Sequence, residues 1–197
     1  EIRLSLVGSE MCIRDRVQTA LQDMGVLGTT IIWFEHANEG PTPRPQDQYR
    51  QMAMSSVGTH DLPPTLAYLR GEHIALRARL GLLTTSVADE VEQDREWQEQ
   101  VKDNLQAYGM LENRENEEDF LVALHEYVAG TPSALTITNV VDMVGDVRAQ
   151  NLPGTTKEQY PNWCIPLCNT DGEPVLLEEL PQQELFQRLA QVAARPN

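Results

Sequence analysis

Three short apolar or β-branched runs, separated by helix-like segments, constrain the fold of this chain most. They lie at residues 29–34, 55–59 and 134–140, and each reads as a strand without a polar face. Strands of that kind are buried on both sides, as in parallel sheets that helices cover. The pattern predicts an α/β fold with parallel strands, as in a barrel or a doubly wound sheet, although three strands are too few to close a barrel.

Helical patterns fill most of the remaining sequence. Apolar residues recur at helical spacing in residues 15–24, 49–54, 65–70, 71–130 and after Pro181. Ser86, followed by acids at positions 89 and 90, predicts one helix start inside the long stretch, and the acidic run at residues 112–119 predicts another helix that ends at Gly130. We therefore expect a large helical share.

The charge balance restricts the partners. Lys and Arg number 15 against 30 Asp and Glu, so the formal net charge is −15. Such a field repels phosphate backbones, and no basic stripe interrupts it, which argues against nucleic acid or an anionic membrane as a partner. The longest apolar runs are far shorter than the roughly 20 residues of a membrane-spanning helix. We expect no nucleic acid, no membrane, and a neutral or cationic ligand.

The cysteines and glycines indicate which cellular compartment and which cofactors to expect. Cys12, Cys164 and Cys168 are the three cysteines, a small and odd number that suits free thiols in a cytoplasmic, reducing compartment. The spacing of Cys164 and Cys168 lacks the second ligand pair of a zinc site, and no Gly-rich phosphate loop occurs. We therefore expect no metal and no cofactor.

A polar turn follows the second predicted strand directly. His60 and Asp61 stand just past its C-terminal end, where parallel barrels hold their reactive groups. Pro63 and Pro64 then open a helix. Asp61 is therefore a candidate catalytic carboxylate with His60 beside it. The alternative, which the local pattern alone favours, is that Asp61 caps the helix and His60 bonds a loop carbonyl.

A second cluster suits a sugar ligand. Asn151 begins a loop that is followed by Tyr160 and Trp163. Amide and flat aromatic groups match the hydroxyl rim and the apolar faces of a pyranose ring. The alternative is a rigid loop that Tyr160 and Trp163 pack onto the body of the protein, which is the more common use of aromatic residues.

The tip of the first predicted strand offers a third cluster. Trp33 and Glu35 are candidates to line the mouth of the same site, with a core position as the alternative for Trp33. His73 and His125 lie in helical stretches with no other ligand-type residues around them. We expect surface or satisfied core positions for both histidines.

Longer runs resemble one family. Residues 49–63, which contain S-V-G-T-H-D-L-P, and residues 71–83 resemble the 4-alpha-glucanotransferases, or amylomaltases, of glycoside hydrolase family seventy-seven. The tail agrees, because residues 151–155 and 158–163 are similar to that family's closing signatures around N-x-P-G-T and P-N-W. Both blocks occur in the family's order, and together they cover about residues 17–197.

The resemblance implies a fold for residues 17–197: the C-terminal part of the catalytic (β/α)₈ TIM barrel, incomplete and with a large helical share. Residues 29–34, 55–59 and 134–140 would be its sixth, seventh and eighth strands. It also implies an activity, the transfer of α-1,4-glucan segments to glucose or maltooligosaccharide acceptors by a retaining double displacement. The expected partners are therefore α-1,4-glucans and maltooligosaccharides.

The same resemblance implies residue roles. Asp61 matches the family's third catalytic carboxylate, which stabilises the oxocarbenium-like transition state without reacting, and His60 matches the neighbouring sugar contact. Together with the clusters above, this makes Trp33, Glu35 and Asn151 the further substrate-binding candidates.

The chain departs from the resembled family at two motifs. Neither R-I-D-H, which carries the nucleophile, nor E-D-L-G, which carries the acid/base, occurs in the sequence. Residues 1–16 stand where the second motif is expected and are interpreted as an artefactual, non-native segment, so Glu10 receives no role. Cys164 stands where the family usually has Arg. Because a retaining reaction needs its nucleophile, the isolated chain is expected to be an inactive fragment.

Two other functions fit parts of the pattern. A related α-glucan hydrolase would complete the second step with water, and it would convert maltotriose only into shorter sugars. A non-catalytic glucan-binding or interaction module would lack the two missing motifs in its upstream sequence as well.

Overall fold

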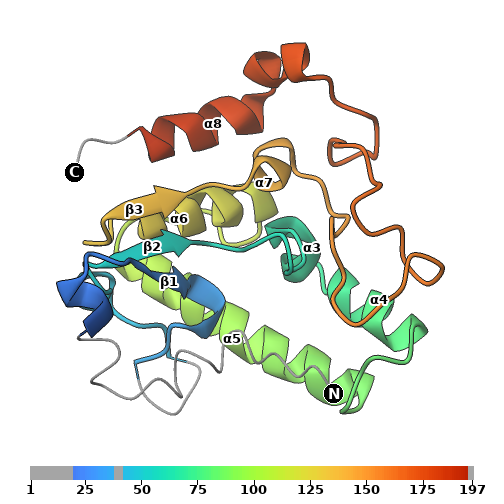
Figure 1. Ribbon diagram of the computed structural model, residues 1–197, viewed down its shortest axis with the longest axis horizontal. Coiled ribbons are helices and arrows are strands. Elements are labelled where there is room, and N and C mark those ends of the chain that lie inside the picture. Colours follow the sequence, from blue (N-terminus) through green and yellow to red (C-terminus); the bar gives the residue numbers. More distant parts are fainter. Residues whose placement is uncertain (1–19, 38–41, 195–197) are drawn as a thin grey trace.

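The sheet of the computed structural model has three short parallel strands in sequential order (Figure 1). They are β1 (Gly28–Ile31), β2 (Ala53–Ser56) and β3 (Leu135–Ile137). In their register Thr30 lies opposite Ser55, and Ser55 lies opposite Thr136. The structure describes residues 20–37 and 42–194. Parallel strands linked through helices confirm the predicted α/β class.

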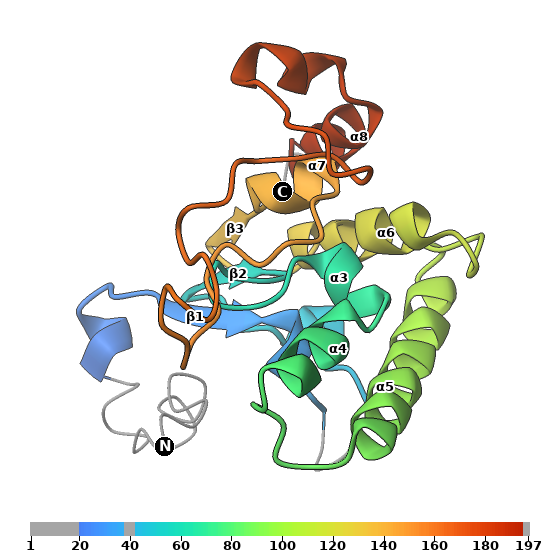
Figure 2. The ribbon, with the colours of Figure 1, turned by 90° about the vertical axis from the view of Figure 1, so that its right-hand side faces the viewer.

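Helices connect the strands, and Figure 2 shows α3, α4, α5 and α6 gathered on one side of them. The α-helices with both ends in the described part are α3 (Thr65–Leu69), α4 (Glu72–Arg79), α5 (Val87–Ala107), α6 (Glu117–Ala129), α7 (Val140–Val144) and α8 (Glu184–Ala193), and residues 20–23 are also helical, as predicted. Three 3-10 helices join them, η1 (Ile32–Phe34), η2 (Gln46–Gln48) and η3 (Leu177–Gln182). Helix α6 contacts β2, α5 and α8. Among the described helices none is long and apolar enough to span a bilayer.

Local capping groups explain where the long helices begin. The Ser86 side chain accepts a hydrogen bond from the Asp89 backbone N–H at 3.1 Å, as the sequence predicts. Asn116 caps α6 by accepting from the backbone N–H groups of Glu118 and Asp119. Helix α6 therefore begins inside the acidic run rather than at its start, and it ends before Gly130 as expected.

Aromatic and aliphatic side chains from α5 and α6 form the main core. Leu105, Leu124 and Tyr127 have no exposed surface. A second buried cluster lies beneath α8, where Leu185 and Leu189 confirm the predicted apolar face of the last helix. These two clusters hold the helices against the sheet, because burying apolar surface is the main favourable contribution to folding.

Three predicted strands were too long or displaced. The first ends at Ile31, and the turn η1 that follows sends Ile32 and Trp33 into the core. The second covers Ala53–Ser56 rather than residues 55–59. The third covers only Leu135–Ile137, and Val140, the last residue of its predicted range, begins α7. Ile32 and Trp33 are buried in a turn instead of a strand, whereas Leu135 and Ile137 are exposed, so the expectation that the third strand is buried on both faces was wrong.

The prediction of a helix at residues 49–54 was wrong. The backbone there pairs with both neighbouring strands, because the Met52 carbonyl accepts from Gly28 N–H at 3.0 Å and the Gln51 carbonyl accepts from Ala134 N–H at 2.8 Å. Tyr49 is buried and meets the ring of Tyr127 edge-on. Sheet pairing and core packing therefore outweigh the helical pattern. Pro181 also lies inside η3, so α8 begins three residues after it, at Glu184.

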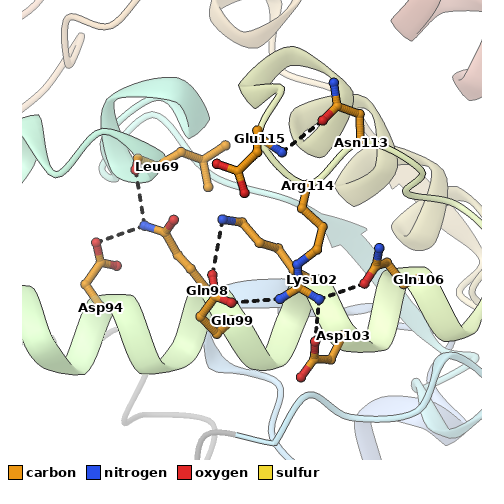
Figure 3. Close-up of polar contacts among 10 residues, drawn as sticks. All are labelled: Leu69, Asp94, Gln98, Glu99, Lys102, Asp103, Gln106, Asn113, Arg114 and Glu115. Carbon is orange, nitrogen blue, oxygen red and sulfur yellow. Dashed lines mark hydrogen bonds and ion pairs between the residues drawn. The ribbon is translucent and has the colours of Figure 1, made fainter.

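A cluster of charged side chains ties the connection after α5 back onto that helix (Figure 3). The Arg114 guanidinium donates to Glu99 at 2.7 Å, to Asp103 at 2.5 Å and to Gln106 at 2.7 Å. Lys102 adds a contact of 3.3 Å to Glu99. The cluster fixes the turn between α5 and α6 and lies outside the main core.

Candidate functional site

Asp61 lies in the loop that leaves β2, with its carboxylate half-buried between two other loop residues. Its Oδ1 accepts a hydrogen bond from Asn151 Nδ2 at 2.6 Å, and its Oδ2 lies 3.4 Å from His60 Nε2. Asp61 N–H donates to Thr59 Oγ1 at 3.3 Å, which holds the turn. The structure thus brings together three predicted site residues, Asp61, His60 and Asn151, from segments 90 positions apart in the chain.

Asp61 does not cap the helix that follows it. The first N–H of α3, from Thr65, donates to Asp142 Oδ1 at 2.8 Å, and the Thr65 hydroxyl donates to Oδ2 at 2.8 Å. The capping interpretation was therefore wrong. Asp142 satisfies the helix end in its place, and the Asp61 carboxylate contacts Asn151 and His60 instead.

Asp142 is a buried carboxylate whose contacts the sequence did not predict. It is 1% exposed and also lies 3.2 Å from His125 Nε2, so a buried carboxylate joins α3, α6 and α7 beneath the site. The prediction of a satisfied core position for His125 is confirmed. In the sequence Asp142 is one polar residue of the segment after the third predicted strand, so no local signal links it to Thr65.

The loop that contributes Asn151 is held by its own hydrogen bonds. Leu152 N–H donates to Asn162 Oδ1 at 2.7 Å, and Asn162 Nδ2 donates to Thr155 Oγ1 at 2.9 Å. The Tyr160 hydroxyl donates to the Ala149 carbonyl at 2.7 Å, and burial raises the pKa of Tyr160. Tyr160 therefore anchors the loop, as the interpretation of a rigid, packed loop predicted for this residue.

Trp163 does not act as a second anchor of that loop. Its side chain is 63% exposed, and its ring centroid lies 5.3 Å from that of His60. The interpretation of Trp163 as a packing residue was therefore wrong. The indole stands at the surface next to the Asp61–Asn151 pair.

Trp33 and Glu35 make their contacts with residues other than Asp61, His60 and Asn151. Trp33 is 6% exposed and stacks on Tyr68 with ring centroids 4.1 Å apart, which favours the core position weighed for it. Its indole nitrogen also lies near Gly58 in the loop after β2, 3.9 Å from the position of an added Cβ. Glu35 forms an ion pair of 2.7 Å with Arg44.

A separate cavity of about 350 Å³ lies between α4 and α5. Tyr68 and His73 stack along its wall at 4.3 Å, with Asp94 and Trp97 nearby. Burial lowers the pKa of His73 to about 4 and raises that of Asp94 to about 6. The prediction of a surface or satisfied core position for His73 holds only in part, because its buried Nδ1 has no partner among the described residues.

The described cysteines and potential metal ligands are dispersed. Cys164 is exposed and Cys168 is buried, and both are free thiols, while Cys12 lies outside the described residues. Within residues 20–37 and 42–194, no group of three or more His, Cys, Asp or Glu side chains could hold a metal ion. The interpretation of residues 1–16 also falls outside the described part and stays a prediction.

Known proteins match this chain over most of its length. A model of the 4-alpha-glucanotransferase family matches residues 7–170. A 4-alpha-glucanotransferase of Mycobacterium tuberculosis is 45% identical over 161 residues, covering 79% of this chain and 22% of that protein. One of Haemophilus influenzae is 25% identical over 169 residues, covering 81% of this chain and 24% of that protein.

Solved structures agree with the sequence match. The crystal structure of amylomaltase from Corynebacterium glutamicum superposes with a TM-score of 0.87 at 47% identity, covering 93% of this chain and 28% of that one. The chain thus spans less than a third of the length of each of these relatives. Since the family model covers well over half of the sequence, the chain belongs to the 4-alpha-glucanotransferase family.

Proposed function

We propose that this chain is the part of a 4-alpha-glucanotransferase that carries one of its catalytic carboxylates, Asp61. The observation that supports this most is the position of Asp61 in the loop that follows β2, where Asp142 rather than Asp61 bonds the start of α3 and Asn151 bonds the Asp61 carboxylate. The three parallel strands would be the sixth to eighth of a (β/α)₈ barrel, a fold that keeps its reactive groups at the C-terminal ends of its strands. The complete enzyme acts in the cytoplasm and transfers α-1,4-glucan segments to glucose or maltooligosaccharides.

The reaction is a double displacement with retention. A carboxylate nucleophile attacks the anomeric carbon and expels the leaving sugar, which a second carboxyl group protonates; the 4-hydroxyl of an acceptor then attacks the glucosyl intermediate with that second group as the base. Asp61 takes no part in bond making. It accepts hydrogen bonds from hydroxyls of the distorted glucosyl unit, and these bonds strengthen as positive charge develops on the ring.

The neighbouring residues support that role. Asn151 donates to one Asp61 oxygen and fixes the carboxylate. In the proposal its other amide hydrogen and its amide oxygen bond substrate hydroxyls. His60 is 64% exposed and contacts a sugar hydroxyl beside Asp61. In this proposal Glu35 and Trp33 belong to the mouth of the site in the complete enzyme, although in this chain Glu35 pairs with Arg44 and Trp33 lies in the core.

The isolated chain is inactive in this proposal. The resembled family carries its nucleophile in an R-I-D-H motif and its acid/base in an E-D-L-G motif. Neither motif occurs in this sequence. Without the nucleophile the covalent intermediate cannot form, whatever the geometry around Asp61. Mixing the 197-residue chain with maltotriose should therefore give no products.

The test uses the full-length protein that contains this chain and both motifs. With maltotriose as substrate, the wild-type protein should form glucose and longer maltooligosaccharides, and Asp61→Asn should lower the rate by about a hundredfold or more. The exposed Asp171→Asn is the matched control and should leave the rate unchanged. If wild type releases only shorter sugars, the protein is a hydrolase; if Asp61→Asn keeps full activity, the role of Asp61 is refuted.

A further inference from the structure

Trp163 adopts a backbone conformation that a side chain of its size rarely takes. Its φ is 62°, and among the described residues it is the one non-glycine residue with positive φ. Glycine occupies this left-handed region with the least strain, whereas a bulky residue persists there only where the surrounding structure enforces it. Such positions concentrate at binding and active sites.

The loop enforces this conformation through its backbone. Trp163 N–H donates to the Gln150 carbonyl at 2.8 Å, and Cys164 N–H donates to the Pro161 carbonyl at 3.1 Å. Asn162, the preceding residue, bonds across the loop to Leu152 and Thr155. The turn is therefore built by the backbone and by Asn162, and it does not need the indole for its own packing.

The indole is presented to solvent at one specific place. Trp163 is 63% exposed, whereas the other two tryptophans of the chain, Trp33 and Trp97, are at most 8% exposed. Its ring lies 5.3 Å from that of His60 with a tilt of 46°, so two exposed rings form a corner beside Asp61. An exposed apolar side chain is common on protein surfaces, but here the exposure coincides with a positive φ and with a position beside His60 and Asp61, which favours a binding role for the indole.

We propose that Trp163 is a sugar-binding residue whose indole face stacks on a glucosyl ring next to the unit bound by Asp61. The inference rests on the proposed function, since it assumes an α-glucan at Asp61. A pyranose ring presents apolar C–H faces that fit an aromatic plane, while its hydroxyls remain available to His60 and Asn151. A glucan chain passing Asp61 would place its neighbouring ring in the corner of His60 and Trp163.

Two substitutions in the full-length protein test the contact. Trp163→Asn removes the aromatic face with a residue that tolerates positive φ, and Trp163→Tyr keeps an aromatic face. Trp163→Asn should raise the KM of maltotriose, or of glucose as added acceptor, by about tenfold with a smaller effect on kcat. Trp163→Tyr should stay within about threefold of wild type. Leu177→Asn, which removes an equally exposed apolar side chain in η3, is the control and should change neither constant.

A binding measurement separates direct contact from a disturbed loop. Maltooligosaccharides should quench the emission of the exposed tryptophan in the Leu177→Asn control, and this quenching should be lost in Trp163→Tyr. Unchanged KM values in Trp163→Asn, or an increased KM without any tryptophan quenching in the control, would overturn the proposal. Failure of wild type to lengthen maltotriose would instead refute the proposed function, and the quenching would still report on sugar contact at Trp163.

Discussion

The helical layer and the third strand bury their apolar side chains to very different degrees. In α5 and α6, Leu105 and Leu124 have no exposed surface, whereas Leu135 and Ile137 in β3 are 53% and 41% exposed. Strands of parallel sheets are usually covered on both faces. The helical layer therefore supplies most of the stability of the described chain. The candidate site lies in the loop after β2 and the loop that contains Asn151 and Trp163, where Asp61 is half-buried and Trp163 is exposed.

A matched pair of leucines tests this difference directly. Leu124→Ala empties a fully buried position in α6 and should lower the free energy of unfolding by about 2–5 kcal/mol, through lost burial and the cavity that remains. Leu135→Ala in β3 removes a half-exposed side chain and should change it by only about 0.5 kcal/mol. Urea unfolding of both variants measures the contrast. Similar losses at the two positions would show that β3 is covered in solution.

The class of the fold could be predicted from the sequence better than the ends of its elements. Caps such as Ser86 act locally, so the pattern found the start of α5. The extended conformation of residues 49–54 depends on distant residues. Tyr49 packs against Tyr127, and the carbonyls of Gln51 and Met52 accept from two other strands, which no local pattern contains. For the same reason the strand at residues 134–140 shortens to three residues once Val140 enters α7.

The candidate site shows the same division between local and distant information. His60 and Asp61 follow a strand, and this local position pointed to them. The local pattern also favoured Asp61 as a helix cap, because it could not reveal that Asp142, 77 positions after Thr65, takes that role. For Trp163 the pattern allowed a sugar contact or a packed position and favoured packing, because it could not reveal the backbone turn, closed through Gln150, that exposes the indole.

His73 and Asp94, which line the cavity beside α4 and α5, should make the free energy of unfolding depend on pH. In wild type the net effect should be smaller than that of Leu124→Ala. His73 has its pKa lowered by burial from 6.5 to about 4, so its contribution to stability is present above pH 6.5 and is lost as the pH falls through about 4. Asp94 has its pKa raised by burial from 3.8 to about 6, so its contribution is present below pH 3.8 and is lost as the pH rises through about 6. The two dependences oppose each other.

Single substitutions should separate these two contributions. Asp94→Asn leaves His73 alone, so the free energy of unfolding should fall more steeply than in wild type as the pH is lowered from 6.5 to 4. His73→Gln leaves Asp94 alone, so stability should instead rise relative to wild type as the pH is lowered from 6 to 3.8. Urea unfolding across pH 3.5–7 measures both slopes. Equal slopes in the two variants would mean that neither group is buried as described.

The smallest effect is expected at the charged cluster that joins α5 to the start of α6 (Figure 3). Arg114 contacts Glu99, Asp103 and Gln106, but its side chain is 28% exposed, so solvent and salt screen these interactions. Arg114→Gln should lower the melting temperature slightly in low salt, and the difference should shrink in 1 M NaCl. Arg95→Gln, which removes one more exposed pair with Glu92, should have still less effect. If the decrease in melting temperature caused by Arg114→Gln did not depend on salt, the cluster would stabilise the protein through packing and not through screened charge interactions.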